Sequence, residues 1–157
     1  MTDISFLEKV DVFKGLSDAQ LTAISEKCET LSLSRKDQLF AQGEPSTHLW
    51  LVLEGEIDLR QEKDKDDDTS ISFVSRSDTF GWTCFVPPYQ YRLTAVCASH
   101  TCRVIRITKK DLESLFQADV SIGYRVMKYL IQAVGRHFQE FQDELAKVRG
   151  HDIMHQW

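Results

Sequence analysis

The 157-residue sequence contains no stretch that approaches the roughly 18 uninterrupted apolar residues of a membrane-spanning helix. Its first ten residues already include Asp3, Glu8 and Lys9, unlike the apolar core of a secretion signal. It also lacks an excess of basic residues, since 24 Asp and Glu against 19 Lys and Arg give a formal charge of -5. That charge opposes binding along a nucleic-acid duplex. These absences predict a soluble cytoplasmic protein with no signal peptide, no membrane anchor and no direct nucleic-acid partner.

Cysteine is sparse, and the four residues present form no CxxC pair. A chain of this length needs no disulfide framework, so the composition favours unpaired thiols in a reducing compartment. One alternative stays open. A two-residue turn at Ser99 and His100 would place Cys97 directly across from Cys102, as a functional thiol pair requires.

Catalytic patterns are absent as well: the sequence has no nucleophile triad, no Gly-rich phosphate loop and no Cys-His motif. The nearest imitation is of a cupin, a small β-barrel metalloenzyme. Gly43, His48 and Glu54 match part of its first metal motif, but Trp50 occupies the place of the second histidine. We therefore predict no catalytic residues and no metal site, keep a cupin-type enzyme as the less favoured alternative, and interpret the histidines as solvent-facing or packing residues.

Short apolar runs, separated by turn-forming residues, occupy the middle of the chain. About eight such runs at 8–12-residue spacing predict a mainly β fold, an antiparallel jelly-roll β-barrel. The charged segment 62–68 interrupts two of them and is predicted to be a solvated hairpin tip rather than a metal site. Seven of these runs are Leu31 with Leu33, Leu39 with Phe40, Leu49–Leu53, Ile57 with Leu59, Ile71–Val74, Tyr91–Cys97 and Cys102–Ile107.

Helical patterns flank the barrel. A small helical segment comes first, with Ser17 placed as an N-cap, and a short helix is predicted over residues 109–116. A long helix follows over about residues 119–149. We predict a single domain over residues 1–157, with the barrel at about 29–108.

The long helix carries the strongest periodic signal in the chain. Its apolar residues are alternately four and three apart, an a/d heptad pattern that lasts for about four heptads, or about 45 Å. We expect the first turns to dock on the barrel and the later turns to pair with a second copy in a homodimer. The alternative is that the later residues fold back on their own barrel. The pattern comprises Val120, Tyr124, Met127, Ile131, Val134, Phe138, Phe141, Leu145 and Val148, of which Met127, Ile131, Val134, Phe138, Phe141 and Leu145 form the candidate dimer interface.

This order of elements resembles the cyclic-nucleotide-binding domain family, the sensory fold of Crp/Fnr-type regulators and cyclic-nucleotide-dependent kinases. Two segments carry the resemblance over about residues 4–148. Residues Val12–Ser17 match the family's entry to its N-terminal helices, and Gly43–Gly55 is similar to its glycine-bounded strand. The resemblance implies a non-enzymatic regulatory or sensory module with flanking helices and a jelly-roll barrel.

A third segment lies where ligand-binding members of the family cradle the cyclic phosphate. There the family has Phe-Gly-Glu and, further along, an arginine followed by a small or hydroxyl residue. This chain has Phe80-Gly81-Trp82 and then Arg92-Leu93-Thr94, so the arginine matches and the glutamate does not. The resemblance marks as candidate ligand-binding residues Gly81, Trp82, Thr83, Cys84, Arg92, Leu93 and Thr94.

Trp82 changes the chemistry of that segment. In the family the glutamate accepts hydrogen bonds from the ribose, whereas an indole offers one N–H donor and no acceptor. Losing a charge-assisted hydrogen bond costs about 1.5–3 kcal/mol, roughly 10- to 150-fold in affinity. Arg92 can still hold a phosphate bidentately, unless it pairs with a local carboxylate or projects into solvent. The candidate ligand is thus a weakly bound cyclic nucleotide or another anionic small molecule.

Two functions remain open. In one, a ligand at Arg92 changes how the long helix packs; in the other, the domain is a degenerate, ligand-free dimerisation or docking module. The aromatic residues Trp82, Phe85, Tyr89 and Tyr91 either line an altered pocket or fill a vacated one as packed core. Residues 150–157 are too few for a DNA-binding helix-turn-helix, so unless the chain is a fragment we expect no direct DNA binding. A downstream protein is a candidate partner.

Overall fold

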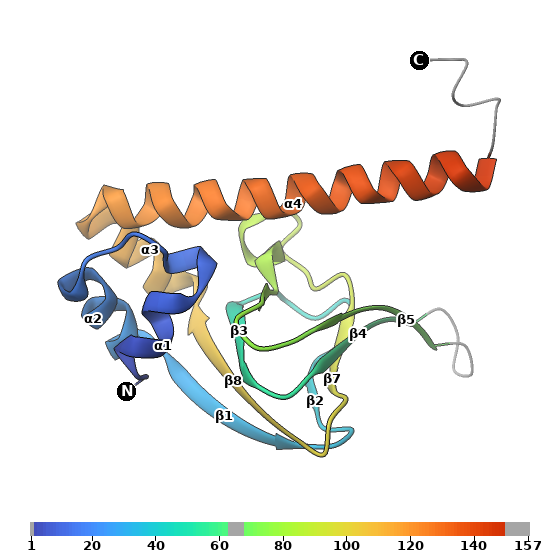
Figure 1. Cartoon of the computed structure of the whole chain (residues 1–157), viewed down its shortest axis with the longest axis horizontal. Helices are drawn as coiled ribbons and strands as arrows, with labels where there is room; N and C mark the ends of the chain where they lie inside the picture. The colour runs from blue at the N-terminus through green and yellow to red at the C-terminus, as the bar shows by residue number, and fades with distance from the viewer. Residues whose placement is uncertain (1, 63–67, 150–157) are drawn as a thin grey trace.

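The strands of the computed structural model, which describes residues 2–62 and 68–149, form two antiparallel four-stranded sheets (Figure 1). Their bounds are β1 Glu29–Ser34, β2 Gln38–Phe40, β3 His48–Glu54, β4 Ile57–Glu62, β5 Asp68–Val74, β6 Thr79–Phe80, β7 Thr94–Cys97 and β8 Thr101–Thr108. One sheet has the order β1-β8-β3-β6 and the other the order β2-β7-β4-β5. The predicted jelly roll is confirmed, whereas most of the charged hairpin tip predicted at 62–68 lies outside the described residues.

The strand predicted over Tyr91–Cys97 is too long, because β7 begins only at Thr94. The backbone of Tyr91 is engaged elsewhere: its N–H donates to Glu44 O at 2.9 Å, and its carbonyl accepts from Gly43 N at 2.8 Å. These bonds hold Tyr91 against the loop after β2, so it does not join the strand pairing that β7 makes from Thr94 onward. Arg92 therefore lies in an irregular segment at the mouth of the barrel rather than within a strand.

The helices are α1 Ile4–Lys9, the 3-10 helix η1 Asp11–Phe13, α2 Asp18–Lys27, the 3-10 helix η2 Trp82–Phe85, α3 Lys109–Ala118 and α4 Val120–Arg149. Ser17 caps α2 as predicted, since its side chain accepts from Gln20 N while the Gln20 side chain accepts from Ser17 N. Figure 1 shows α1, α2 and α3 gathered beside the first turns of α4, at one end of the molecule. Among the described residues, no helix has both the length and the apolar character needed to cross a bilayer.

Buried apolar residues form two clusters. The larger joins α1, α2, α3 and the first half of α4 to one sheet, and it includes Leu7, Phe13, Leu21, Ile24, Leu49, Ile105, Leu112 and Val126. The smaller lies within the barrel and comprises Phe40, Trp50, Val52, Ile57, Phe80, Tyr91, Ala95, Cys97, Cys102 and Val104. Of the candidate ligand-binding residues, Cys84 is buried within the larger cluster and Trp82 packs against it.

Helix α4 has two apolar faces. The first turns do dock, but through Ile122, Val126 and Leu130, which are buried and belong to the larger cluster. The heptad pattern lies on a different face, which we call the heptad face. Its large residues are exposed along its whole length, including Val120 at the start and Phe138 near the end. The alternative in which the later heptad residues fold back on the barrel is therefore wrong.

Candidate ligand-binding site

The site begins at a tight turn between β6 and η2. Gly81 adopts a left-handed backbone conformation with φ 79°, which a residue with a side chain rarely takes. A Cβ at this position would lie 2.6 Å from Trp50 Cδ1 and 3.2 Å from His48 O. Both the conformation and the close approach require glycine. The turn therefore sets η2, and with it Trp82, directly against β3.

A small pocket of about 110 Å³ opens between this turn, the segment before β7 and helix α4. Five of the seven candidate residues line it: Gly81, Trp82, Thr83, Arg92 and Leu93. The remaining wall is formed by Phe40, Leu59, Ser72, Val74, Thr79, Phe80, Tyr91 and His137. The structure thus brings together residues that are distant in the sequence, and whether they bind a ligand remains a prediction.

The other two candidates lie outside the pocket. Cys84 belongs to the larger core cluster, and burial raises the pKa of its thiol to about 12. The Thr94 hydroxyl accepts a hydrogen bond from Gln42 N at 2.9 Å. Although Thr83 lines the pocket, its hydroxyl lies 2.9 Å from Ser46 Oγ in a buried hydrogen bond. Internal hydrogen bonds therefore engage the hydroxyls of both candidate threonines.

Cationic chemistry at the pocket comes from Arg92. Its side chain is exposed at the mouth, and no described carboxylate lies within 4.0 Å of its guanidinium. Its five N–H donors suit a planar or tetrahedral anion. His137 reaches the same pocket from α4, with Nδ1 3.9 Å from Glu140 Oε2. Sequence reasoning assigned His137 to solvent or packing, since only the docking of α4 brings it near Arg92.

Aromatic residues fill the barrel behind the pocket. Phe40 stacks on Tyr91 with ring centroids 3.7 Å apart, and Trp50 Nε1 donates to Tyr91 Oη at 3.1 Å. Tyr91 is thus packed core, which is one of the two expectations for the aromatic residues near Arg92. Tyr89 is instead exposed, with Lys109 Nζ 3.7 Å from its ring centroid. These packed aromatic rings leave the pocket shallow.

Trp82 stands between the pocket and a larger apolar groove. This groove has a volume of about 540 Å³ and follows α4. It is lined by Trp82, Phe85, Val86, Tyr124, Met127, Lys128, Leu130, Ile131 and Val134, three of which are candidate dimer-interface residues. One indole therefore borders both the predicted ligand site and the heptad face.

The model of the cyclic nucleotide-binding domain family matches residues 30–119 of this chain. The sequence is 18% identical to the CRP-like cAMP-activated global transcriptional regulator of Mycobacterium tuberculosis over 94% of its own length, and it spans 63% of that regulator. A cyclic nucleotide-binding domain from Methylobacillus flagellatus KT has a similar fold, with a TM-score of 0.78 at 20% identity over 94% of this chain and 83% of that one.

A third similar structure is the regulatory subunit of a cAMP-independent protein kinase A from Trypanosoma brucei. Its TM-score is 0.73 at 17% identity, over 90% of this chain and 50% of that one. Together the match to the family model and the shared fold define the class: this chain belongs to the cyclic nucleotide-binding domain family. Members of this family are typically non-catalytic regulatory modules.

Proposed function

We propose that this chain is a regulatory domain that dimerises through the heptad face of α4 and takes a small anionic ligand at Arg92. One observation carries the proposal: α4 contributes to both features at adjacent positions. His137 lines the pocket, and Phe138 beside it belongs to the heptad face. A ligand that contacts His137 favours one placement of α4 and so biases the dimer.

The exposure of the heptad face supports a second copy as the dimer partner. Ile131 is 73% exposed, Phe138 60% and Phe141 58%, although all three are large and apolar. Apolar surfaces of this extent usually mark an interaction site. The alternating spacing of four and three residues is the one that two like helices need to interlock along a shared seam. The same face on a second copy provides that complement under two-fold symmetry.

The size and charge of the pocket define the ligand class. Its volume of about 110 Å³ lies below the roughly 300–1,000 Å³ of ordinary small-molecule sites. A compact anion fits this space, whereas a cyclic nucleotide requires Trp82 or Tyr91 to move and binds weakly.

A ligand-free dimerisation module is the second candidate. It is favoured by the stacked Phe40 and Tyr91, which occupy the barrel interior behind the pocket. In that case Arg92 is a surface residue, and the heptad face alone carries the function.

A thermal-melt titration separates the two candidates. The wild type is titrated to millimolar concentration with cyclic AMP, cyclic GMP and inorganic pyrophosphate, with adenosine monophosphate as the non-cyclic control. A ligand at 100 times its Kd adds about 2.7 kcal/mol, which raises the midpoint by roughly 5–10 °C. We expect a saturable rise with at least one of the anions that disappears in Arg92→Gln and persists in Arg35→Gln, an exposed arginine away from the pocket. If none of the anions shifts the midpoint, the ligand-free module is the correct function.

A further inference from the structure

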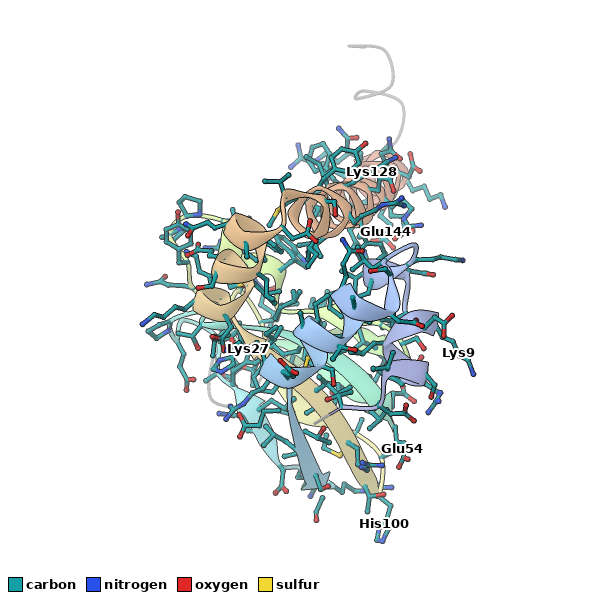
Figure 2. All side chains as sticks on the ribbon, turned by 90° about the vertical axis from the view of Figure 1, so that its left-hand side faces the viewer. Lys9, Lys27, Glu54, His100, Lys128 and Glu144 are labelled. Carbon is teal, nitrogen blue, oxygen red and sulfur yellow. A yellow bond between two sulfur atoms is a disulfide. The ribbon has the colours of Figure 1, made fainter. Side chains whose placement is uncertain are left out.

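Three turns meet around a disulfide at the end of the barrel opposite α4. Cys97, the last residue of β7, is bonded to Cys102, the second residue of β8. Figure 2 shows the exposed tip of this hairpin, His100, at the far end of the molecule from Lys128 and Glu144 on α4. The structure therefore has the two cysteines paired across the Ser99 turn, and the expectation of unpaired thiols at these two positions is wrong.

The disulfide joins the two sheets. Strand β7 pairs with β2 and β4, whereas β8 pairs with β1 and β3. The hairpin between them therefore crosses from one sheet to the other, and within the described part of the chain β7 and β8 form no ladder with each other. The Cα atoms of the two cysteines lie 6.1 Å apart, within the range that a disulfide spans without backbone movement.

The surrounding backbone suits the reduced pair as well as the oxidised one. Cys97 Sγ lies 3.3 Å from Ser99 O, and Cys102 Sγ lies 3.3 Å from Glu56 O. Each carbonyl is therefore in place to accept the S–H of a free thiol. A buried thiol pair then leaves no donor unsatisfied, so reduction requires no rearrangement of the turns.

The turns also fix where the sulfur atoms lie. Glu56 N donates to Ser99 Oγ at 2.9 Å, which ties the turn before β4 to the hairpin. Gly55 has φ 87°, and a Cβ there would lie 2.7 Å from Ser99 Oγ and 3.0 Å from Cys102 Sγ. Glycine is thus the residue that lets this turn approach the cysteine pair. The pair is held in register whether or not its sulfur atoms are bonded.

We propose that Cys97 and Cys102 form a reversible dithiol–disulfide site, oxidised by thiol exchange with a small-molecule disulfide. One thiolate attacks the small disulfide to give a mixed disulfide, and the second thiolate displaces the remaining small thiol. Two protein thiols and one small disulfide thus yield the intramolecular bond and two small thiols. The two protein thiol protons end on the two released small thiols, and the electrons balance.

The remaining thiols are poor competitors for this reaction. Burial raises the pKa of Cys28 to about 12 and that of Cys84 to about 12, so both stay protonated at neutral pH. The thiolate is the reactive form in exchange. Cys97 and Cys102 are also buried, but they flank a short hairpin tip whose His100 is exposed, so exchange at this pair requires only that the tip open.

The site is coupled to the barrel interior by packing. Cys97 and Cys102 belong to the same buried cluster as Phe40 and Tyr91, the stacked pair behind the candidate ligand pocket. The proposal concerns covalent chemistry at the hairpin and does not depend on whether Arg92 binds a ligand.

The wild type is tested first. It is equilibrated in buffers with graded ratios of reduced to oxidised glutathione, the exchange is quenched with acid, and the free thiols are alkylated before trypsin digestion. Cleavage after Arg92 and Arg103 leaves both cysteines in one peptide, residues 93–103. The reduced peptide carries two alkyl groups, whereas the disulfide peptide carries none and is about 2 Da lighter than the unmodified dithiol. We expect reversible formation and loss of this species, while Cys28 and Cys84 remain alkylated throughout. The oxidised form should melt roughly 4–8 °C above the reduced form, because the bond restricts the unfolded chain.

Two variants complete the test. In Cys97→Ala the difference in melting between oxidising and reducing buffer should vanish, while Cys28→Ala, the matched control, should keep it. A cysteine pair that stays reduced at every glutathione ratio overturns the proposal. A disulfide that can be reduced only after the protein is unfolded also overturns it, because such a bond is a permanent cross-link. A stable glutathione adduct on one cysteine, without the intramolecular bond, overturns it too.

Discussion

Trp82 is the main chemical difference between this chain and the ligand-binding family members that it resembles. Its indole supplies a donor where a carboxylate would accept, and it fills the space between the pocket and the α4 groove. Arg92 retains the cationic half of the site. Under the proposed function, these two residues together favour anions that need charge and little volume.

Replacing this indole tests what limits nucleotide binding. In Trp82→Glu we expect the affinity for cyclic AMP to rise about tenfold or more, because the carboxylate restores a charge-assisted acceptor and the side chain is smaller. Isothermal titration calorimetry measures the change. Trp82→Gln is the matched control, because glutamine has the same length as glutamate and an acceptor oxygen but no charge. Its affinity for cyclic AMP should rise less. An unchanged affinity in a folded Trp82→Glu variant would show that the Phe40–Tyr91 stack closes the site by itself.

Five of the seven candidate residues line one pocket, but whether they bind a ligand remains a prediction, and the sequence did not give their hydrogen bonds. Gly81, Trp82 and Arg92 could be placed together because the resemblance covers the segment that holds them. The hydroxyl of Thr94 could not be assigned, because its acceptance of the Gln42 N–H depends on how the loop after β2 folds. The His137 side chain is 71% exposed, as predicted for a solvent-facing histidine, but its place at the edge of the pocket follows from the docking of α4, and no local pattern encodes it.

At the scale of elements, helix α4 has two apolar faces, one docked on the larger core cluster and one exposed as the heptad face. The heptad periodicity made its exposed face predictable, since a repeat every 3.5 residues suits a partner helix. The docking face was not predicted, because Ile122, Val126 and Leu130 are spaced four apart and give a weaker signal beneath the heptads. The premature start assigned to β7 has a related cause. An apolar run does not reveal that its first backbone groups bond to a distant loop.

The heptad face makes a prediction about assembly. Phe138→Asp combined with Phe141→Asp should give a folded monomer, because two buried charges opposite their symmetry mates oppose pairing. Multi-angle light scattering measures the mass of the particle, and circular dichroism checks the fold. The control, Gln132→Asp with Gln139→Asp, adds the same charges at two exposed positions of the same helix away from the seam and should remain dimeric. A wild type that is already monomeric at tens of micromolar would contradict the assignment.

At the scale of the whole molecule, pocket and heptad face are linked through one helix. Linkage requires that a ligand which strengthens the dimer binds the dimer more tightly than the monomer by the same factor. Allosteric coupling free energies of about 1–3 kcal/mol correspond to roughly 5- to 150-fold.

We therefore expect the dimer dissociation constant, measured by sedimentation with and without saturating ligand, to change by several-fold. The ligand affinity of the Phe138→Asp, Phe141→Asp monomer should differ from that of the wild-type dimer by the same factor. Equal affinities in monomer and dimer would show that the two surfaces are independent.

The position of Trp82 has an optical consequence. Trp50 is 2% exposed within the barrel, so its emission stays nearly constant, whereas Trp82 is half-buried at the boundary of pocket and groove. Covering it with a second copy shifts its emission to shorter wavelength, and an anion beside Arg92 alters its intensity. With Trp157 replaced by phenylalanine, the protein carries its own fluorescent reporter, which distinguishes association from ligand capture without an attached dye.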